Sequence, residues 1–153
     1  WLIHPKFEIF GNYALLNSTF DDEDSDGNRQ ELAGNRFRLT PRGSGAIGFD
    51  FNTPLSSNPN GVQFQLTPSY TFKTHHFFED QNTLGLEQEG YALLNVHAVF
   101  IFPRQNVQLQ FFANNLLDEK YLIDAGNTGG AFGIPTFVAG PRRFIGTKIR
   151  FQF

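Results

Sequence analysis

Apolar and polar residues alternate along several long stretches of this chain. The alternation is strictest at the carboxyl end, where Ile145, Ile149 and Phe151 occupy odd positions and Lys148 and Arg150 occupy even ones. Successive side chains of a β-strand point to opposite faces of a sheet, so this pattern predicts a strand with one apolar and one charged face. Such a strand fits a soluble sandwich, where the apolar face lies on a core, or a membrane barrel, where it contacts lipid.

Similar alternation in five earlier stretches predicts an all-β chain of six full strands, and an apolar stub at residues 1–3 is expected to end a seventh. The stretches run over roughly 10–14 residues, whereas soluble strands usually have about 5–6 and a tilted membrane-spanning strand needs about 9–11. Glycines at 43, 45 and 48 indicate a bend or a close backbone approach. The five stretches lie within residues 6–20, 35–52, 61–73, 90–102 and 106–121.

The connections between these strands alternate between short and long. Segments 4–5, 52–60 and 102–106 are short and rich in Pro and Asn, as turns are. The longer connections are polar or Gly-rich and cover 21–34, 74–90 and 124–140. In an up-and-down sheet all short turns then lie at one end and all long loops at the other, which is typical of outer-membrane barrels. We therefore expect an antiparallel, up-and-down transmembrane β-barrel segment, with a soluble β-sandwich as the alternative.

Composition narrows the classes of function. The chain has 153 residues, which predicts one domain, and no cysteine, which removes disulfides and thiolate metal sites. Its net charge of -3 and the lack of a basic run argue against a nucleic-acid partner. The chain begins without Met or a signal peptide, so we expect a mature product or a fragment.

The acidic segment 21–28 resembles the start of a calcium-binding loop. Asp22, Asp24, Asp26 and the glycine after them match the opening D-x-D-x-D-G of an EF-hand, but Ala33 stands where the twelfth-position Glu belongs. The three aspartates are therefore a calcium candidate, and the alternative is a solvated acidic loop.

The segment "THHFFED" carries the other candidate chemistry. His75 and His76 are adjacent, so in an extended chain they point to opposite sides, and we expect no metal site from the pair. With Asp80 they are the only candidates for a catalytic base, and no nucleophile motif or phosphate-binding loop accompanies them. We therefore expect neither an enzyme nor a bound cofactor.

Two carboxyl-terminal segments are similar to a known family. "LQFFANNLLDEKY", followed by a Gly-rich loop and "GPRRFIGTKIRFQF", resembles the carboxyl end of TonB-dependent outer-membrane receptors. The stretch 114–121 matches an "NNLFDKKY"-like segment, and Gly140, Pro141 and Arg142 match the start of the last strand, which ends on Phe153. The terminal segment is fairly specific, whereas the earlier strands match any such barrel.

The resemblance implies a 22-stranded barrel of which residues 1–153 form about the last six to seven strands, without the plug domain. Such receptors lie in the outer membrane of Gram-negative bacteria and import scarce ligands, mostly ferric siderophores, with energy from the TonB complex. In this family the long external loops help to close over the ligand. By this resemblance, the loop with His75, His76, Phe77 and Phe78 would contact it. A passive porin-like barrel, or a structural barrel that closes by oligomerisation, is the alternative function.

The resemblance also assigns roles to the two faces of the strands. Arg36, Arg38, Arg42, Lys148 and Arg150 would face the lumen, where they would pair with plug carboxylates or attract anionic ferric chelates. Lipid would cover the apolar face, and lipopolysaccharide would surround the external loops. The barrel assembly machinery would read the terminal signal formed by Ile145, Ile149, Phe151 and Phe153. No recognisable motif in the sequence specifies the ligand.

Overall fold

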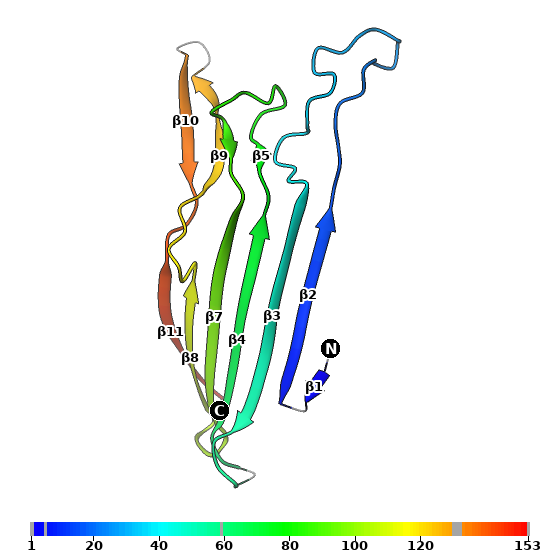
Figure 1. Cartoon of the computed structure of the whole chain (residues 1–153). Coiled ribbons are helices and arrows are strands. Elements are labelled where there is room, and N and C mark those ends of the chain that lie inside the picture. Colours follow the sequence, from blue (N-terminus) through cyan, green and yellow to red (C-terminus); the bar gives the residue numbers. More distant parts are fainter. Residues whose placement is uncertain (1, 5, 59, 130–132, 153) are drawn as a thin grey trace.

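The computed structural model describes residues 2–4, 6–58, 60–129 and 133–152, and the side chains of 6–58, 60–126 and 133–152. Its main body is one antiparallel sheet of seven strands in the order β1-β2-β3-β4-β7-β8-β11 (Figure 1). The strands of this sheet are β1 (Leu2–His4), β2 (Phe7–Leu15), β3 (Gly43–Pro54), β4 (Gln63–Lys73), β7 (Tyr91–Phe102), β8 (Val107–Asn114) and β11 (Phe144–Phe151).

Each strand of the sheet pairs with the strand before it in this order, which confirms the up-and-down topology. The sheet does not close, because β1 and β11 lie at its two ends (Figure 1). The only helix among the described residues is the 3-10 turn η1 (Pro103–Gln105), and none is long and apolar enough to cross a membrane. An open sheet with two unpaired edges is expected of a partial barrel, since closure is what removes edges.

The predicted division into short turns and long loops is also confirmed. The turns between β3 and β4 and between β7 and β8 lie at one end of the sheet, and the long loops lie at the other (Figure 1). Two small hairpins extend the sheet at the long-loop end. The first pairs β5 (His76–Phe77) with β6 (Glu87–Gln88), and the second pairs β9 (Leu122–Gly129) with β10 (Ile134–Ala139).

Two of the elements predicted from the sequence were wrong. The strand expected over 35–52 begins only at Gly43, and Arg36 forms an isolated bridge to Thr19 instead. Leu39 has a φ of 56°, a left-handed conformation that interrupts the extended chain, so the alternation before Pro41 is not a strand. The segment 124–140, expected to be a loop, supplies most of the β9–β10 hairpin.

The described side chains form almost no interior. A buried hydrophobic cluster consists of Phe78, Leu86 and Ala125, with Leu122 packed against it, and it lies among the long loops. In the sheet itself, Val99 is the one buried hydrophobic side chain among those described. The sheet is thus a single layer with both faces open, unlike a sandwich, in which one face of each sheet is covered.

Candidate functional site

The strand register sorts the side chains of the sheet into two chemically different faces. Residues directly opposite each other in neighbouring strands point to the same side. Leu66 is opposite Ala98, and Ala98 is opposite Phe111, so these three lie on one face. Ring contacts continue the same face across the sheet, with centroid distances of 5.0 Å for Phe64–Phe100, 6.1 Å for Phe100–Phe111, 5.0 Å for Phe7–Phe49 and 6.0 Å for Tyr13–Phe72.

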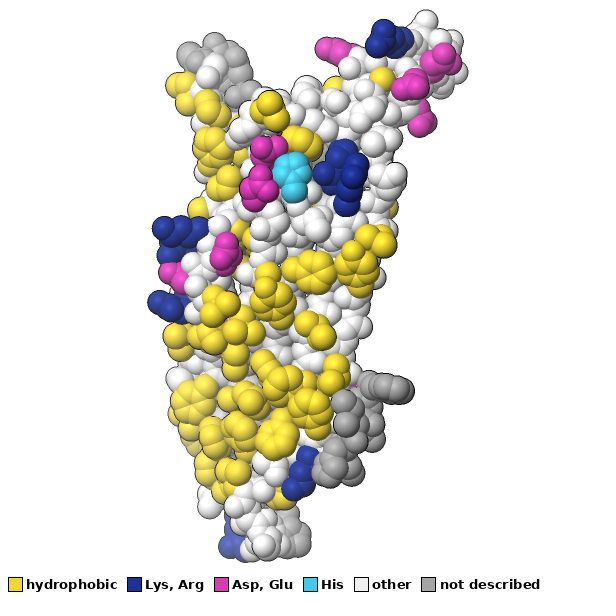
Figure 2. Space-filling model, viewed as in Figure 1, with side chains coloured by type: hydrophobic (Ala, Val, Ile, Leu, Met, Phe, Trp, Pro, Cys, Tyr) yellow, Lys and Arg dark blue, Asp and Glu magenta, His cyan; other side chains and the backbone are white. Residues whose placement is uncertain are grey.

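This apolar face is exposed. Ile47 retains 57% and Ile149 58% of its accessible surface, and Tyr13 retains 62%. Figure 2 shows hydrophobic side chains gathered in a broad band over the strands, with charged side chains mostly above and below it. A contiguous apolar surface of this kind is unfavourable in water and requires an apolar partner.

The opposite face carries the polar partners of the same strands. Lys148 is paired with Gln110 and Arg150 with Gln108, so both cations lie on the face opposite to Ile149. Further across, the Thr67 hydroxyl lies 2.5 Å from a carboxylate oxygen of Asp50, on the same polar face. The predicted alternation of Ile145, Ile149 and Phe151 with Lys148 and Arg150 is therefore present in the structure. Phe153 lies outside the described residues.

The other predicted cations do not lie on a strand. Arg36, Arg38 and Arg42 precede β3, in the connection between β2 and β3. The Arg36 guanidinium donates hydrogen bonds to the backbone oxygens of Thr40, at 3.0 Å, and His75, at 3.4 Å. Arg38 Nε lies 3.9 Å from Asp80 Oδ2. Arg36 and Arg38 thus contact the neighbouring long loop, and their assignment to a lumen-facing strand rested on the wrong strand boundary.

The loop with the two histidines forms the β5–β6 hairpin, whose two sides differ. His76 and Phe78 are buried, and their rings meet edge to face at 5.4 Å. Burial lowers the pKa of His76, which keeps its imidazole neutral, and its Nδ1 lies 3.2 Å from the Thr74 carbonyl oxygen. His75 and Phe77 contact each other edge to face at 4.9 Å. Contact of these four residues with a ligand stays a prediction.

In the calcium candidate, the central carboxylate of Asp24 accepts hydrogen bonds from the backbone of its own loop. Asp24 Oδ1 accepts hydrogen bonds from the backbone N–H groups of Asp26, at 2.9 Å, and Asn28, at 2.8 Å. These bonds lower the pKa of Asp24 and close a tight turn. The backbones of Glu23 and Arg29 form an isolated antiparallel β-bridge across this turn. A loop held this way needs no ion for its shape, and calcium binding by Asp22, Asp24 and Asp26 stays untested.

Sequence reasoning missed a polar cluster that joins segments 114–121 and 140–142, the two segments on which the family resemblance rests. Asn115 is buried, has a φ of 50°, and donates through its side chain to the carbonyl oxygens of Glu119, at 2.9 Å, and Pro141, at 3.0 Å. Asp118 binds Arg142 through both carboxylate oxygens. The signal was present in "NNLLDEKY" and "GPRR", but the sequence does not show that they touch.

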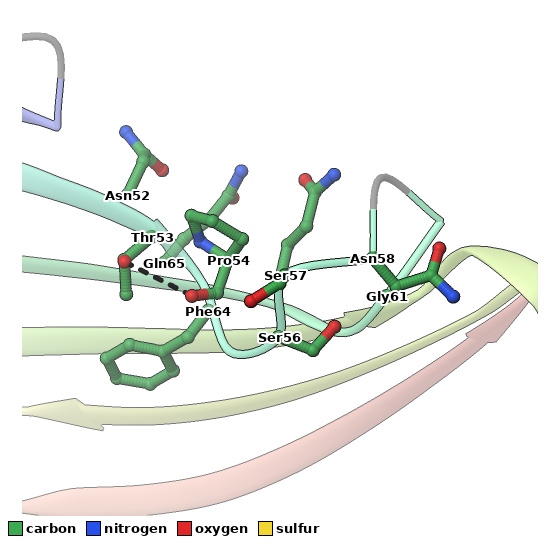
Figure 3. Close-up of a pocket in the computed structure, with 10 residues that line it drawn as sticks. Asn52, Thr53, Pro54, Ser56, Ser57, Asn58, Gly61, Phe64 and Gln65 are labelled. Carbon is green, nitrogen blue, oxygen red and sulfur yellow. Dashed lines mark hydrogen bonds between the residues drawn. The ribbon is translucent and has the colours of Figure 1, made fainter.

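A cavity at the short-turn end is lined by uncharged side chains. It has a volume of about 460 Å³ and lies beside the turn that joins β3 and β4 (Figure 3). Its described lining consists of amides, hydroxyls, glycine, proline and Phe64, with no titratable group. General acid–base chemistry has no donor there.

Comparison with known proteins gives matches only among solved structures. No family model matches the chain, and no curated protein does. The ferric yersiniabactin uptake receptor FyuA from Yersinia pestis is 18% identical, with a TM-score of 0.82 over 100% of this chain and 22% of that one. The chain has the fold of part of a receptor barrel. BauA, the ferric preacinetobactin receptor from Acinetobacter baumannii, is 17% identical, with a TM-score of 0.67, over 96% of this chain and 19% of its own.

A third match has the same character. The ferric citrate transporter FecA is 20% identical, with a TM-score of 0.69 over 95% of this chain and 21% of that one. The chain thus spans about a fifth of the length of the solved structures it matches. The predicted fold class and the resemblance to the carboxyl-terminal barrel segment of TonB-dependent receptors are confirmed at the level of fold.

Proposed function

We propose that this chain is the carboxyl-terminal barrel segment of an outer-membrane receptor for TonB-dependent uptake of a scarce ligand, most simply a ferric siderophore. The observation that carries the proposal is the match over the whole chain to receptors whose names specify ferric chelates as cargo. The exposed apolar face supports placement in the outer membrane, where acyl chains would cover it. The neighbours are receptors and transporters, which supports a function without catalysis.

In this proposal the chain contributes three parts of the receptor. The strands form a section of barrel wall, with Lys148 and Arg150 toward a lumen that holds the plug. The long loops lie outside the cell, beside lipopolysaccharide, and take part in ligand capture. Strand β11 carries the assembly signal that the barrel assembly machinery reads, and the TonB complex acts on a part of the receptor outside residues 1–153.

Iron transport tests the proposal directly. Cells that express the full-length protein containing this chain are given ⁵⁵Fe bound to siderophores from the organism's own iron-starved culture medium. We expect saturable uptake that a protonophore abolishes, because TonB-dependent import uses the proton gradient of the inner membrane. Deleting residues 144–153 should abolish the same uptake by preventing barrel assembly.

The alternative is a passive porin-like barrel or a structural barrel that closes by oligomerisation. This alternative predicts a rate of iron uptake by diffusion that rises linearly with substrate concentration and is unchanged by the protonophore. That result, with the protein correctly assembled in the outer membrane, would exclude the receptor function.

A further inference from the structure

Three potential metal ligands converge at the base of the β5–β6 hairpin. The Nε2 atom of His75 lies 3.0 Å from a carboxylate oxygen of Glu87. Glu89 completes the group, and one ligand atom from each of the three residues lies within 4.8 Å of the others. The cluster therefore contains one imidazole nitrogen and two carboxylates, contributed by both arms of the hairpin.

The positions of these ligands are fixed by the fold. His76 is paired with Gln88 and Phe77 with Glu87, so the register of the hairpin sets the spacing between His75 and the two glutamates. Next to these pairs, Phe78 and Leu86 are buried in a separate hydrophobic cluster with Ala125. A site held between a paired hairpin and a packed cluster loses little conformational freedom when an ion binds.

The charge at the cluster is not balanced by a cation. Within the described part of the chain, no lysine or arginine forms an ion pair with Glu87 or Glu89. Arg36 is nearby, but its guanidinium donates to the backbone oxygens of Thr40 and His75. Two carboxylates without a lysine or arginine partner favour a divalent cation at this position.

The donor set also selects the type of ion. Calcium and magnesium prefer oxygen ligands alone, whereas an imidazole nitrogen with carboxylates suits zinc and its neighbours in the first transition series. His75 Nε2 and the nearer Glu87 carboxylate oxygen are 3.0 Å apart, and a metal ion bound to both atoms would take the place of the hydrogen bond between them. Three protein ligands leave at least one coordination position for water or for an oxygen donor of an arriving molecule.

We propose that His75, Glu87 and Glu89 form a binding site for a divalent transition-metal ion, represented by Zn²⁺. The ion joins the two arms of the hairpin at its base and stiffens the long loop between β4 and β7. The site uses His75 without His76, so it is compatible with the expectation that the adjacent pair does not bind a metal together. It does not depend on the proposed transport function, since metal binding is measured without any siderophore.

Calorimetry with ZnCl₂ on the full-length protein, purified in detergent and stripped with a chelator, tests the site. We expect one saturable site that is weakened tenfold or more by His75→Ala, Glu87→Gln or Glu89→Gln. His97→Ala is the matched control, because His97 lies on the sheet wall, opposite Thr67, and outside the cluster. This control should bind Zn²⁺ like the unmodified protein.

Spectroscopy with Cu²⁺ identifies the ligands independently of affinity. The electron paramagnetic resonance spectrum should show coupling to one imidazole nitrogen, which His75→Ala removes and His97→Ala retains. Circular dichroism of each variant establishes that it is folded. Absence of a saturable site in the unmodified protein, or binding that all three cluster variants leave unchanged in a folded protein, would overturn the proposal.

Discussion

Asn115 joins three segments at the long-loop end of the sheet. Its backbone N–H donates to Asn95, its amide oxygen accepts from the Glu119 backbone, and its amide nitrogen donates to Glu119 and Pro141. Its left-handed φ is one that Asn tolerates better than most residues. One side chain thus holds the end of β8, the following turn and the approach to β11 together.

Replacing this side chain should be costly. Asn115→Ala leaves the Glu119 N–H and two carbonyl oxygens without these partners, and an unsatisfied buried group costs about 1–3 kcal/mol. We expect the free energy of unfolding to fall by about 2–4 kcal/mol, measured by urea titration of the full-length protein in micelles. Asn114→Ala, at the exposed neighbour, should cost less than about 1 kcal/mol. Equal losses in the two variants would contradict this assignment.

Asp118 makes the same region sensitive to acid. The side chain of Arg142 and the backbone N–H of Arg143 hold the pKa of Asp118 well below its usual range. The resulting stabilisation is present above the unfolded pKa of about 3.9 and is lost as the pH falls toward the folded pKa. Asp118→Asn should therefore lower the urea midpoint at pH 6 and progressively less below pH 4.

The control for this pH series is Asp124→Asn, which removes an exposed carboxylate on β9. Its urea midpoint should follow that of the unmodified protein from pH 6 down to pH 2. A difference between Asp118→Asn and the unmodified protein that stays constant over this range would show that the Arg142 pair does not cause the effect.

Strands of the sheet have faces with opposite requirements, and β4 offers a matched pair of positions. Leu66 lies in the middle of the apolar face, and its neighbour Gln65 lies on the polar face. In the proposed receptor, Leu66→Arg should destabilise the barrel by about 2–4 kcal/mol, because the apolar face would then present a cation to the acyl chains near the midplane. Gln65→Arg should cost less than about 1 kcal/mol. Refolding into lipid vesicles at different urea concentrations measures both, and equal costs would contradict the assignment of faces.

Glycines within the strands make room for aromatic rings on the neighbouring strand. A Cβ at Gly45 would lie 2.9 Å from a ring carbon of Phe72, and a Cβ at Gly146 would lie 2.5 Å from a ring carbon of Phe112. Each glycine is directly opposite that aromatic residue. The ring covers the backbone that a glycine leaves bare, as in other sheets with such pairs.

This contact predicts a specific rescue. Gly146→Ala forces the Phe112 ring out of its position, and overpacking of this kind typically costs about 1–3 kcal/mol. The double variant Gly146→Ala with Phe112→Leu should recover part of the loss, because the smaller side chain can yield. Urea midpoints of the single and double variants decide, and additive losses would show that the two sites do not interact.

The strands could be predicted because alternation alone defines them. In β4, β7 and β8 every second side chain is apolar over a whole span, and in β11 only Thr147 interrupts this set. The structure places each of these sets on one face. The same rule failed at 35–42, where the pattern continues although the left-handed Leu39 and the contacts of Arg36 and Arg38 with the next loop break the strand. Alternation records side-chain polarity and not backbone conformation.

The candidate site could be predicted only in part. "HH" and "FF" marked the loop, but the partners of His75 are Glu87 and Glu89, in "LEQEG" across the hairpin. Nothing local in the sequence sets that pairing, because the register is fixed by packing of Phe78, Leu86 and Ala125. Asn115 was likewise visible as a residue but not as a hydrogen-bond centre, because its partners near Pro141 are distant in sequence.

At the scale of the whole molecule, the open edges of β1 and β11 call for neighbouring strands. In the proposed receptor those strands belong to the same polypeptide, since the chain spans 19–22% of the matched receptors. The intact mass of the native protein extracted from outer membranes should then be about five times 17.3 kDa. A native mass equal to that of residues 1–153 would favour a barrel that closes by oligomerisation.

The unbroken pairing of β4 with β7 constrains how such a gene can change. Every residue from Gln63 to Lys73 has a fixed partner between Tyr91 and Ile101. Gain or loss of one codon within either strand would exchange the residues of the apolar and polar faces beyond that point. The same change in the loop between the strands would leave both faces intact. Insertions and deletions among proteins descended from this one should therefore occur in the loops, while the number of residues in each strand is kept.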